Sequence, residues 1–151
     1  MKIPILPTSN ILIDDQLLVA YIVGKKLKVP SKSNLYTTSY YYFRACRAMS
    51  IKLGGVLSGP FLGLPKEKQM VAVTAMLSLP EEIAFLGPRE LIPAMVNVQI
   101  NYPKLNVLNT EAAAALLKLD ATFLCSAESE SGQLRPFLAQ ESIRMNIQSF
   151  D

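Results

Sequence analysis

The chain has 151 residues, half of them hydrophobic, with 15 basic and 12 acidic side chains and a formal net charge of +3. This length suits a single domain over residues 1–151, and the apolar content excludes intrinsic disorder. The sequence contains no His, which excludes Ser-His-Asp and Cys-His hydrolases and every His-ligated zinc site. Any chemistry must therefore use carboxylates, hydroxyls, Lys, Tyr, thiols or a metal held by oxygen.

The basic charge is concentrated near the N-terminus. Residues 1–52 hold eight basic and two acidic side chains, a charge of +6, whereas residues 53–151 carry −3. A basic segment of this kind favours a polyanion such as nucleic acid, although a few solvated lysines in one loop give the same count.

Cysteine usage and hydropathy indicate the cellular compartment of the protein. Cys46 and Cys125 match neither a disulfide framework nor a metal motif, which is typical of a reducing cytosol. No apolar run approaches the roughly 18 residues of a membrane span. The N-terminal segment is too short and too polar for a signal peptide. We therefore expect a cytoplasmic protein with no membrane partner.

The first part of the chain predicts two strands that each lead into a helix. Asn10–Asp14 is an apolar run that ends in acids, as buried strands often do, and the apolar segment Gln16–Val23 predicts a short buried helix. After a basic loop, Leu35–Thr38 predicts a second strand. Ser39 is then placed to cap a helix over Tyr40–Ile51.

The rest of the chain predicts further helices and strands in alternation. The expected helices are Lys66–Leu79, Arg89–Tyr102, Glu111–Leu119 and Leu134–Gln140, and the expected strands are Glu82–Leu86, Ala121–Ser126 and Ile143–Phe150. Asn109 or Thr110 is placed to cap the Ala-rich helix. The apolar face expected for the first of these helices consists of Met70, Val71, Val73, Thr74 and Leu77.

This alternation predicts an α/β fold, a three-layer sandwich with a mostly parallel central sheet and helices on both faces. In such sheets ligands bind outside the carboxyl ends of the strands. That edge would gather Asp14 and Asp15, the residues after Thr38, and the segment Ser126–Glu128.

Three acids at predicted strand or helix ends are candidate metal ligands. Asp14 ends the first strand and faces a helix N-terminus, where a carboxylate either caps the helix or binds a hard cation. Glu111 lies in the first turn of a predicted helix, where an acid is also ordinary, and Glu128 follows a strand. If they converge, their oxygens would select Mg²⁺ or Mn²⁺, ions that activate water at a phosphodiester without any His.

Two other patterns bear on phosphate and nucleic-acid binding. The Gly-rich segment Gly54–Gly63 excludes a P-loop, because Pro60 stands where Lys is required. An aromatic cluster with Arg44 and Arg47 could stack bases and contact phosphate, although a helix that is half core and half surface gives the same pattern. The aromatic residues are Tyr36, Tyr40, Tyr41, Tyr42 and Phe43.

Three segments resemble PIN domains. The segment Ile11–Tyr21 resembles the family's opening, where a hydrophobic strand ends in an acid, followed by two small polar residues and a hydrophobic helix. Thr37–Ser39 before a helix resembles the second strand and helix. The segment Glu111–Glu128 resembles the last metal-binding part, in which an acid opens an Ala-rich helix and a Thr-x-Asp-like triplet follows the strand.

The resemblance implies a Mg²⁺- or Mn²⁺-dependent endoribonuclease, similar to toxin components of bacterial toxin–antitoxin pairs. Asp14, Glu111 and Glu128 would hold the ion and carry the catalysis. RNA phosphates would be neutralised by the basic residues Lys25, Lys26, Arg44 and Arg47. Asp15, Ser39 and Ser126 would contact the metal ligands without binding the ion themselves.

One departure from the family keeps an alternative open. The helix Tyr40–Ile51 contains no acid where the family carries Glu. A degenerate PIN-like module that binds RNA or a protein partner without cutting is the alternative. The mean hydropathy of +0.26 also favours a buried interface, in a homodimer or with an antitoxin-like protein.

Overall fold

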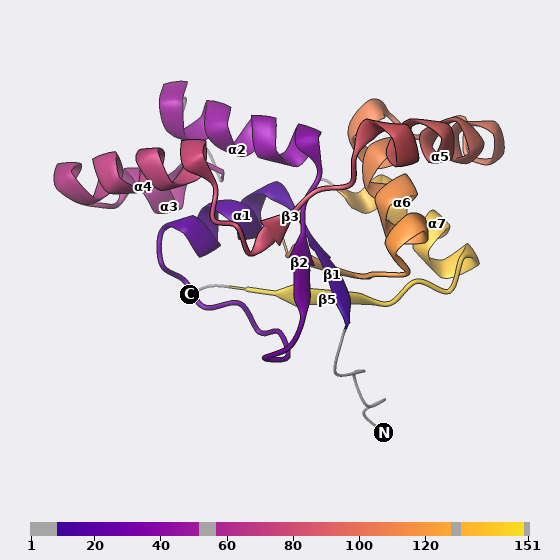
Figure 1. The fold of residues 1–151 in the computed structure, drawn as a ribbon, viewed down its shortest axis with the longest axis horizontal. Coiled ribbons are helices and arrows are strands. Elements are labelled where there is room, and N and C mark those ends of the chain that lie inside the picture. Colours follow the sequence, from indigo (N-terminus) through magenta and orange to yellow (C-terminus); the bar gives the residue numbers. More distant parts are fainter. Residues whose placement is uncertain (1–8, 52–56, 128–130, 150–151) are drawn as a thin grey trace.

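The computed structural model describes residues 9–51, 57–127 and 131–149 and shows an α/β fold (Figure 1). Five parallel strands form one sheet in the order β3-β2-β1-β4-β5. The strands are β1 (Asn10–Ile13), β2 (Asn34–Tyr36), β3 (Ile83–Ala84), β4 (Thr122–Ser126) and β5 (Met145–Gln148). The predicted α/β class and parallel sheet are therefore confirmed.

Helices connect consecutive strands and cover the sheet on both faces. They are α1 (Asp15–Ile22), α2 (Ser39–Ile51), α3 (Gly59–Leu62), α4 (Lys66–Ser78), α5 (Pro88–Asn101), α6 (Val107–Leu119) and α7 (Arg135–Gln140), with a 3₁₀ turn, η1 (Ser131–Leu134), before α7. Helices α1–α4 lie on one side of the sheet, and α5–α7 lie on the other (Figure 1).

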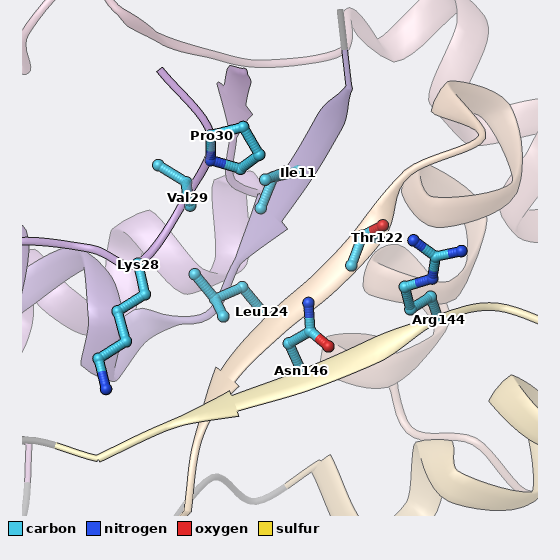
Figure 2. Close-up of a pocket in the computed structure, with 8 residues that line it drawn as sticks. All are labelled: Ile11, Lys28, Val29, Pro30, Thr122, Leu124, Arg144 and Asn146. Carbon is cyan, nitrogen blue, oxygen red and sulfur yellow. The ribbon is translucent and has the colours of Figure 1, made fainter. Parts of the chain in front are cut away.

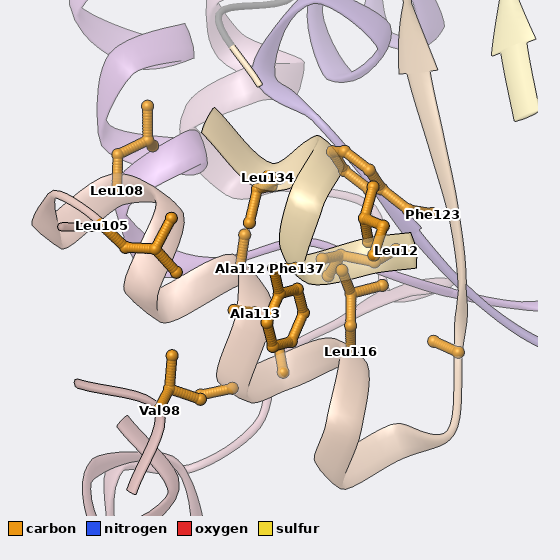
Figure 3. Packing of buried hydrophobic residues seen from close by; sticks show 14 of the residues in the cluster. Leu12, Val98, Leu105, Leu108, Ala112, Ala113, Leu116, Phe123, Leu134 and Phe137 are labelled. Atoms are coloured by element: carbon orange, nitrogen blue, oxygen red, sulfur yellow. The ribbon is translucent and has the colours of Figure 1, made fainter. Parts of the chain in front are cut away.

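Alternating side chains of the central strands divide the core into two clusters. Ile11 and Ile13 of β1 pack with residues of α1–α4. Leu12, between them, packs with Phe123 of β4 and with α5–α7 (Figure 3). Successive strand residues point to opposite faces, so an unbroken apolar run such as residues 11–13 is what a doubly covered strand requires.

Most helices begin at a residue other than the predicted one: α1, α2, α5 and α7 differ from the prediction by one residue, and α6 differs by four. The α2 cap is Thr38, whose Oγ1 accepts a hydrogen bond from Tyr41 N at 3.1 Å, and Ser39 is the first helical residue. Helix α6 begins one turn early, because the Asn106 side chain accepts from Asn109 N at 2.9 Å. The prediction that Asn109 or Thr110 caps this helix is therefore wrong, and Glu111 lies in its second turn.

The predicted apolar face of α4 is also wrong. The helix buries Ala72 and Met76, whereas Met70, Val71 and Leu77 are exposed. The buried side is set by packing against α1 and α2, where the Tyr42 hydroxyl donates to Met76 O at 2.7 Å. The sequence pattern alone favoured the side with the larger side chains.

The loop between α1 and β2 lies across the sheet face beside β4 and β5. Val29 and Pro30 lie over Ile11 and Leu124 at a small pocket (Figure 2). The Gln148 side chain holds this loop: its Oε1 accepts from Lys28 N at 2.8 Å, and its Nε2 donates to Lys26 O at 2.9 Å. Among the described residues, no helix is long and apolar enough to cross a membrane.

Candidate functional site

The strand order places a topological switch point beside β1. The chain moves outward from β1 through β2 to β3, then returns to β4 on the other side of β1. In open parallel sheets, ligands bind in the crevice outside the carboxyl ends of the strands at such a point. Asp14 follows β1 at this edge, and Ser126 ends the adjacent strand β4.

Asp14 is completely buried and joins three elements. Its Oδ1 accepts from Leu17 N at 2.9 Å, and its Oδ2 accepts from Ser126 N at 3.1 Å. It therefore caps α1, which is the first of the two roles expected for it, and ties β1 to β4. A carboxylate can accept about four hydrogen bonds, so capping does not exclude the second role, binding of a cation.

Asp15 forms an ion pair with Arg44. Arg44 Nε lies 3.1 Å from Asp15 Oδ2, and the two side chains are 28% and 8% exposed, respectively. Arg44 is thus the counter-ion of an acid beside the switch point. The pair fixes the start of α1 against α2. It also places a positive charge at the edge where the acids gather.

Glu111 reaches the same edge from α6. Its Oε1 accepts from Tyr40 N at 2.9 Å, at the N-terminus of α2, where the helix dipole favours a negative charge. Glu128 lies outside the described residues, so the expected set of three acids is not tested. Within the described part of the chain, no three Cys, Asp or Glu side chains form a group that could hold a metal ion.

Ser126 and Gln16 connect the ends of β4 and α1. The Ser126 hydroxyl donates to Gln16 Oε1, while its backbone N–H donates to Asp14. On the other side, the Thr37 hydroxyl donates to Ile13 O at 3.1 Å. These bonds hold the carboxyl ends of three neighbouring strands together. Sequence reasoning did not place Gln16 or Thr37 among the site residues; Thr37 directly follows β2, and Gln16 lies in the first turn of α1.

Tyr41, which the sequence placed among the aromatic residues that could stack bases, is instead buried, so its ring is not available for stacking. Its hydroxyl has no hydrogen-bond partner among the described residues. Burial raises the pKa of this phenol well above its ordinary value, and the carboxylates of Asp14 and Asp15 raise it further. Tyr41 therefore stays neutral at physiological pH and keeps a hydrogen-bond donor near two acids.

The remaining basic candidates are exposed side chains of α2 and of the loop after α1. Arg47 is on the exposed side of α2, and Lys25 and Lys26 are exposed just after α1. Through Gln148, the Lys26 backbone is attached to the end of β5. Strand β4 separates β5 from β1, so this loop passes a strand end about 10 Å from that of β1.

No protein-family model matches the chain, and a search of curated proteins found no relative.

Proposed function

We propose that the protein is a Mg²⁺- or Mn²⁺-dependent endoribonuclease of PIN-like type that hydrolyses RNA phosphodiester bonds at the carboxyl edge of its sheet. The observation that carries the proposal is the position of Asp14, a completely buried carboxylate at the switch point of a parallel sheet. Asp15 begins α1, and Glu111 of α6 accepts a hydrogen bond from the N-terminus of α2, so both add acids to this edge.

The donors at this edge suit a hard divalent cation in their chemistry, because carboxylate, amide and hydroxyl oxygens are the ligands that Mg²⁺ and Mn²⁺ prefer. In the proposal Asp14, Glu111 and Glu128 hold the ion. When bound, the ion would lower the pKa of a water and stabilise negative charge on the phosphodiester.

The chain's own residues would prepare the site and bind the substrate. Two backbone amides fix the Asp14 carboxylate in one orientation. The neutral Tyr41 phenol would donate a hydrogen bond within the site. Arg47, Lys25 and Lys26, all exposed, would neutralise phosphates on either side of it.

Cleavage of single-stranded RNA with Mn²⁺ tests the proposal. Wild type should cut, and Asp14→Asn and Glu111→Gln should both abolish cutting. Asp120→Asn is the matched control, because Asp120 is an exposed acid at the end of α6, before β4, where the sheet's opposite edge begins. Cleavage that survives both site substitutions would refute the mechanism.

A second candidate function is RNA binding without cleavage, and the Asp15–Arg44 ion pair favours it. Arg44 adds positive charge at the edge where a metal site needs negative charge. This alternative predicts RNA binding in EDTA that weakens steeply with salt. It also predicts no metal-dependent product, so the same cleavage assay separates the two functions.

For the partner, we propose a second copy of the chain docked on α5. Ile92, Val96 and Ile100 are spaced by four residues along one side of this helix, and each exposes more than half of its surface. In a two-fold antiparallel pair Val96 meets its own copy and Ile92 meets Ile100. An antitoxin-like protein on this surface is the competing outcome.

A further inference from the structure

Helix α2 presents two different sides. Tyr41, Ala45, Ala48 and Met49 are buried in the protein interior. The opposite side carries Tyr40, Phe43, Arg47 and Ile51, spaced by three or four residues as neighbours on one helix face must be. Phe43 is 61% exposed and Tyr40 is 42% exposed. We call these four residues the α2 outer face.

Four consecutive aromatic residues follow Ser39 in this helix, and only the middle pair packs against other elements of the protein. The Tyr41 ring is buried in the core. Tyr42 donates its hydroxyl to Met76 O and packs on Phe85, with ring centroids 5.5 Å apart. Tyr40 and Phe43 instead contact each other edge to face, with ring centroids 6.5 Å apart, and much of both side chains is exposed to solvent.

The charge around these rings suits a polyanion. Helix α2 contains two arginines and no acid, and Arg47 lies one turn beyond Phe43 on the α2 outer face. Arg44 is held by Asp15, so Arg47 is the arginine of this helix that faces solvent. Exposed aromatic rings beside a basic side chain are the combination that binds single-stranded nucleic acid by stacking.

The location connects this face to the candidate site. Tyr40 N donates to Glu111 at the carboxyl edge of the sheet, and Phe43 follows one turn along the helix, about 4.5 Å further. A single strand of RNA bound at the switch point would therefore pass Tyr40 first and Phe43 next. Bases paired in a duplex have no exposed ring faces for these side chains to reach.

We propose that the α2 outer face is a stacking platform for single-stranded RNA. Tyr40 and Phe43 stack on unpaired bases, and Arg47 contacts a phosphate. The proposal rests on the proposed function for the class of ligand. It concerns binding, so it does not depend on a metal ion or on cleavage.

The test measures binding of the full chain to a fluorescently labelled single-stranded RNA of about 12 nucleotides in EDTA. Tyr40→Ala and Phe43→Ala should each weaken binding by about 5- to 160-fold, because stacking of one base contributes about 1–3 kcal/mol. Phe43→Tyr keeps a ring and should restore affinity to near the wild-type value. Met70→Ala is the control, since Met70 is an apolar side chain of α4 that is 73% exposed.

Two further measurements sharpen the result. Arg47→Gln should reduce the slope of log affinity against log salt concentration by about 0.7, the value for one phosphate of a single strand. Binding of the matching RNA duplex should not change with Phe43→Ala. Circular dichroism of each variant verifies its fold, which exposed substitutions should leave intact.

Three outcomes would overturn the platform. In the first, the wild type does not bind single-stranded RNA, and in the second, Phe43→Ala binds it as tightly as the wild type. In the third, light scattering shows that Phe43→Ala no longer forms a dimer that the wild type forms, while its RNA affinity is unchanged. The last would assign the α2 outer face to a second copy of the chain. Phe43-dependent binding without any Mn²⁺-dependent cleavage would sink the nuclease proposal alone.

Discussion

Replacing Asp14 by Asn changes the hydrogen bonds that join β1, α1 and β4 while keeping the side chain the same size. In the wild type both carboxylate oxygens accept from backbone amides, those of Leu17 and Ser126. Asn has one acceptor oxygen, and it caps helices about as well as Asp does. The Leu17 bond is therefore retained, and the Asn side-chain NH₂ is left facing Ser126 N.

The expected cost follows from the bond that is lost. A hydrogen bond to a charged group contributes about 1.5–3 kcal/mol, and two donors then face each other in a buried place. Burying a neutral amide costs less than burying a carboxylate, which offsets part of this loss. We expect Asp14→Asn to lower the free energy of unfolding by about 1–3 kcal/mol. Asp14→Ala also loses the cap, about 1 kcal/mol more.

Urea unfolding followed by circular dichroism measures both changes. Asp120→Asn is the control, because Asp120 is exposed. Its backbone is in the left-handed helical region, with φ of 49°, a conformation that Asn tolerates well. Its stability should stay within about 0.5 kcal/mol of wild type. An Asp14→Asn variant as stable as wild type would refute the bridging role. A confirmed loss would mean that cleavage assays must also use Glu111→Gln, because Asp14→Asn then acts partly through stability.

Three more predictions follow from the described contacts. Tyr41→Phe removes a buried hydroxyl that has no hydrogen-bond partner among the described residues, so the free energy of unfolding in urea should stay the same or rise by up to about 1 kcal/mol. A loss above about 1 kcal/mol would show that the hydroxyl is hydrogen-bonded in solution. The hydrogen bond to Glu82 raises the pKa of Tyr21 to about 12, above the unfolded value near 10. Its stabilisation is present below pH 10 and is lost towards pH 12, so the stability gap between wild type and Tyr21→Phe should shrink there; a constant gap contradicts this. Val96→Asp should convert the proposed dimer to a monomer in light scattering, and an unchanged dimer would exclude α5 as the interface.

The fold was largely predictable because short apolar runs alternate with helical segments along the chain. The residues 11–13 must be buried on both faces, which only a covered parallel sheet provides. The errors came from longer-range packing. The buried side of α4 depends on where α2 lies, and the early start of α6 depends on the Asn106 cap, which lies three residues before the first predicted cap residue.

The candidate site was predictable only in part. The rule for strand ends located Asp14 and Asp15 at the carboxyl edge. Their partners were hidden, because the sequence does not say which strands are neighbours. Ser126 N reaches Asp14 across 112 residues only because Ile13 of β1 pairs beside Leu124 of β4. The Asp15–Arg44 pair likewise depends on the packing of α1 against α2.

The proposed ribonuclease function depends on the claim that a divalent cation binds beside Asp14. Measuring Mn²⁺ binding tests this claim most directly. Electron paramagnetic resonance distinguishes bound from aqueous Mn²⁺ during titration of the full chain. We predict one bound ion per chain, lost in Asp14→Asn and in Glu111→Gln and retained in Asp120→Asn. Wild-type protein that binds no Mn²⁺, or that binds it equally well after both site substitutions, would contradict the proposed metal-dependent ribonuclease.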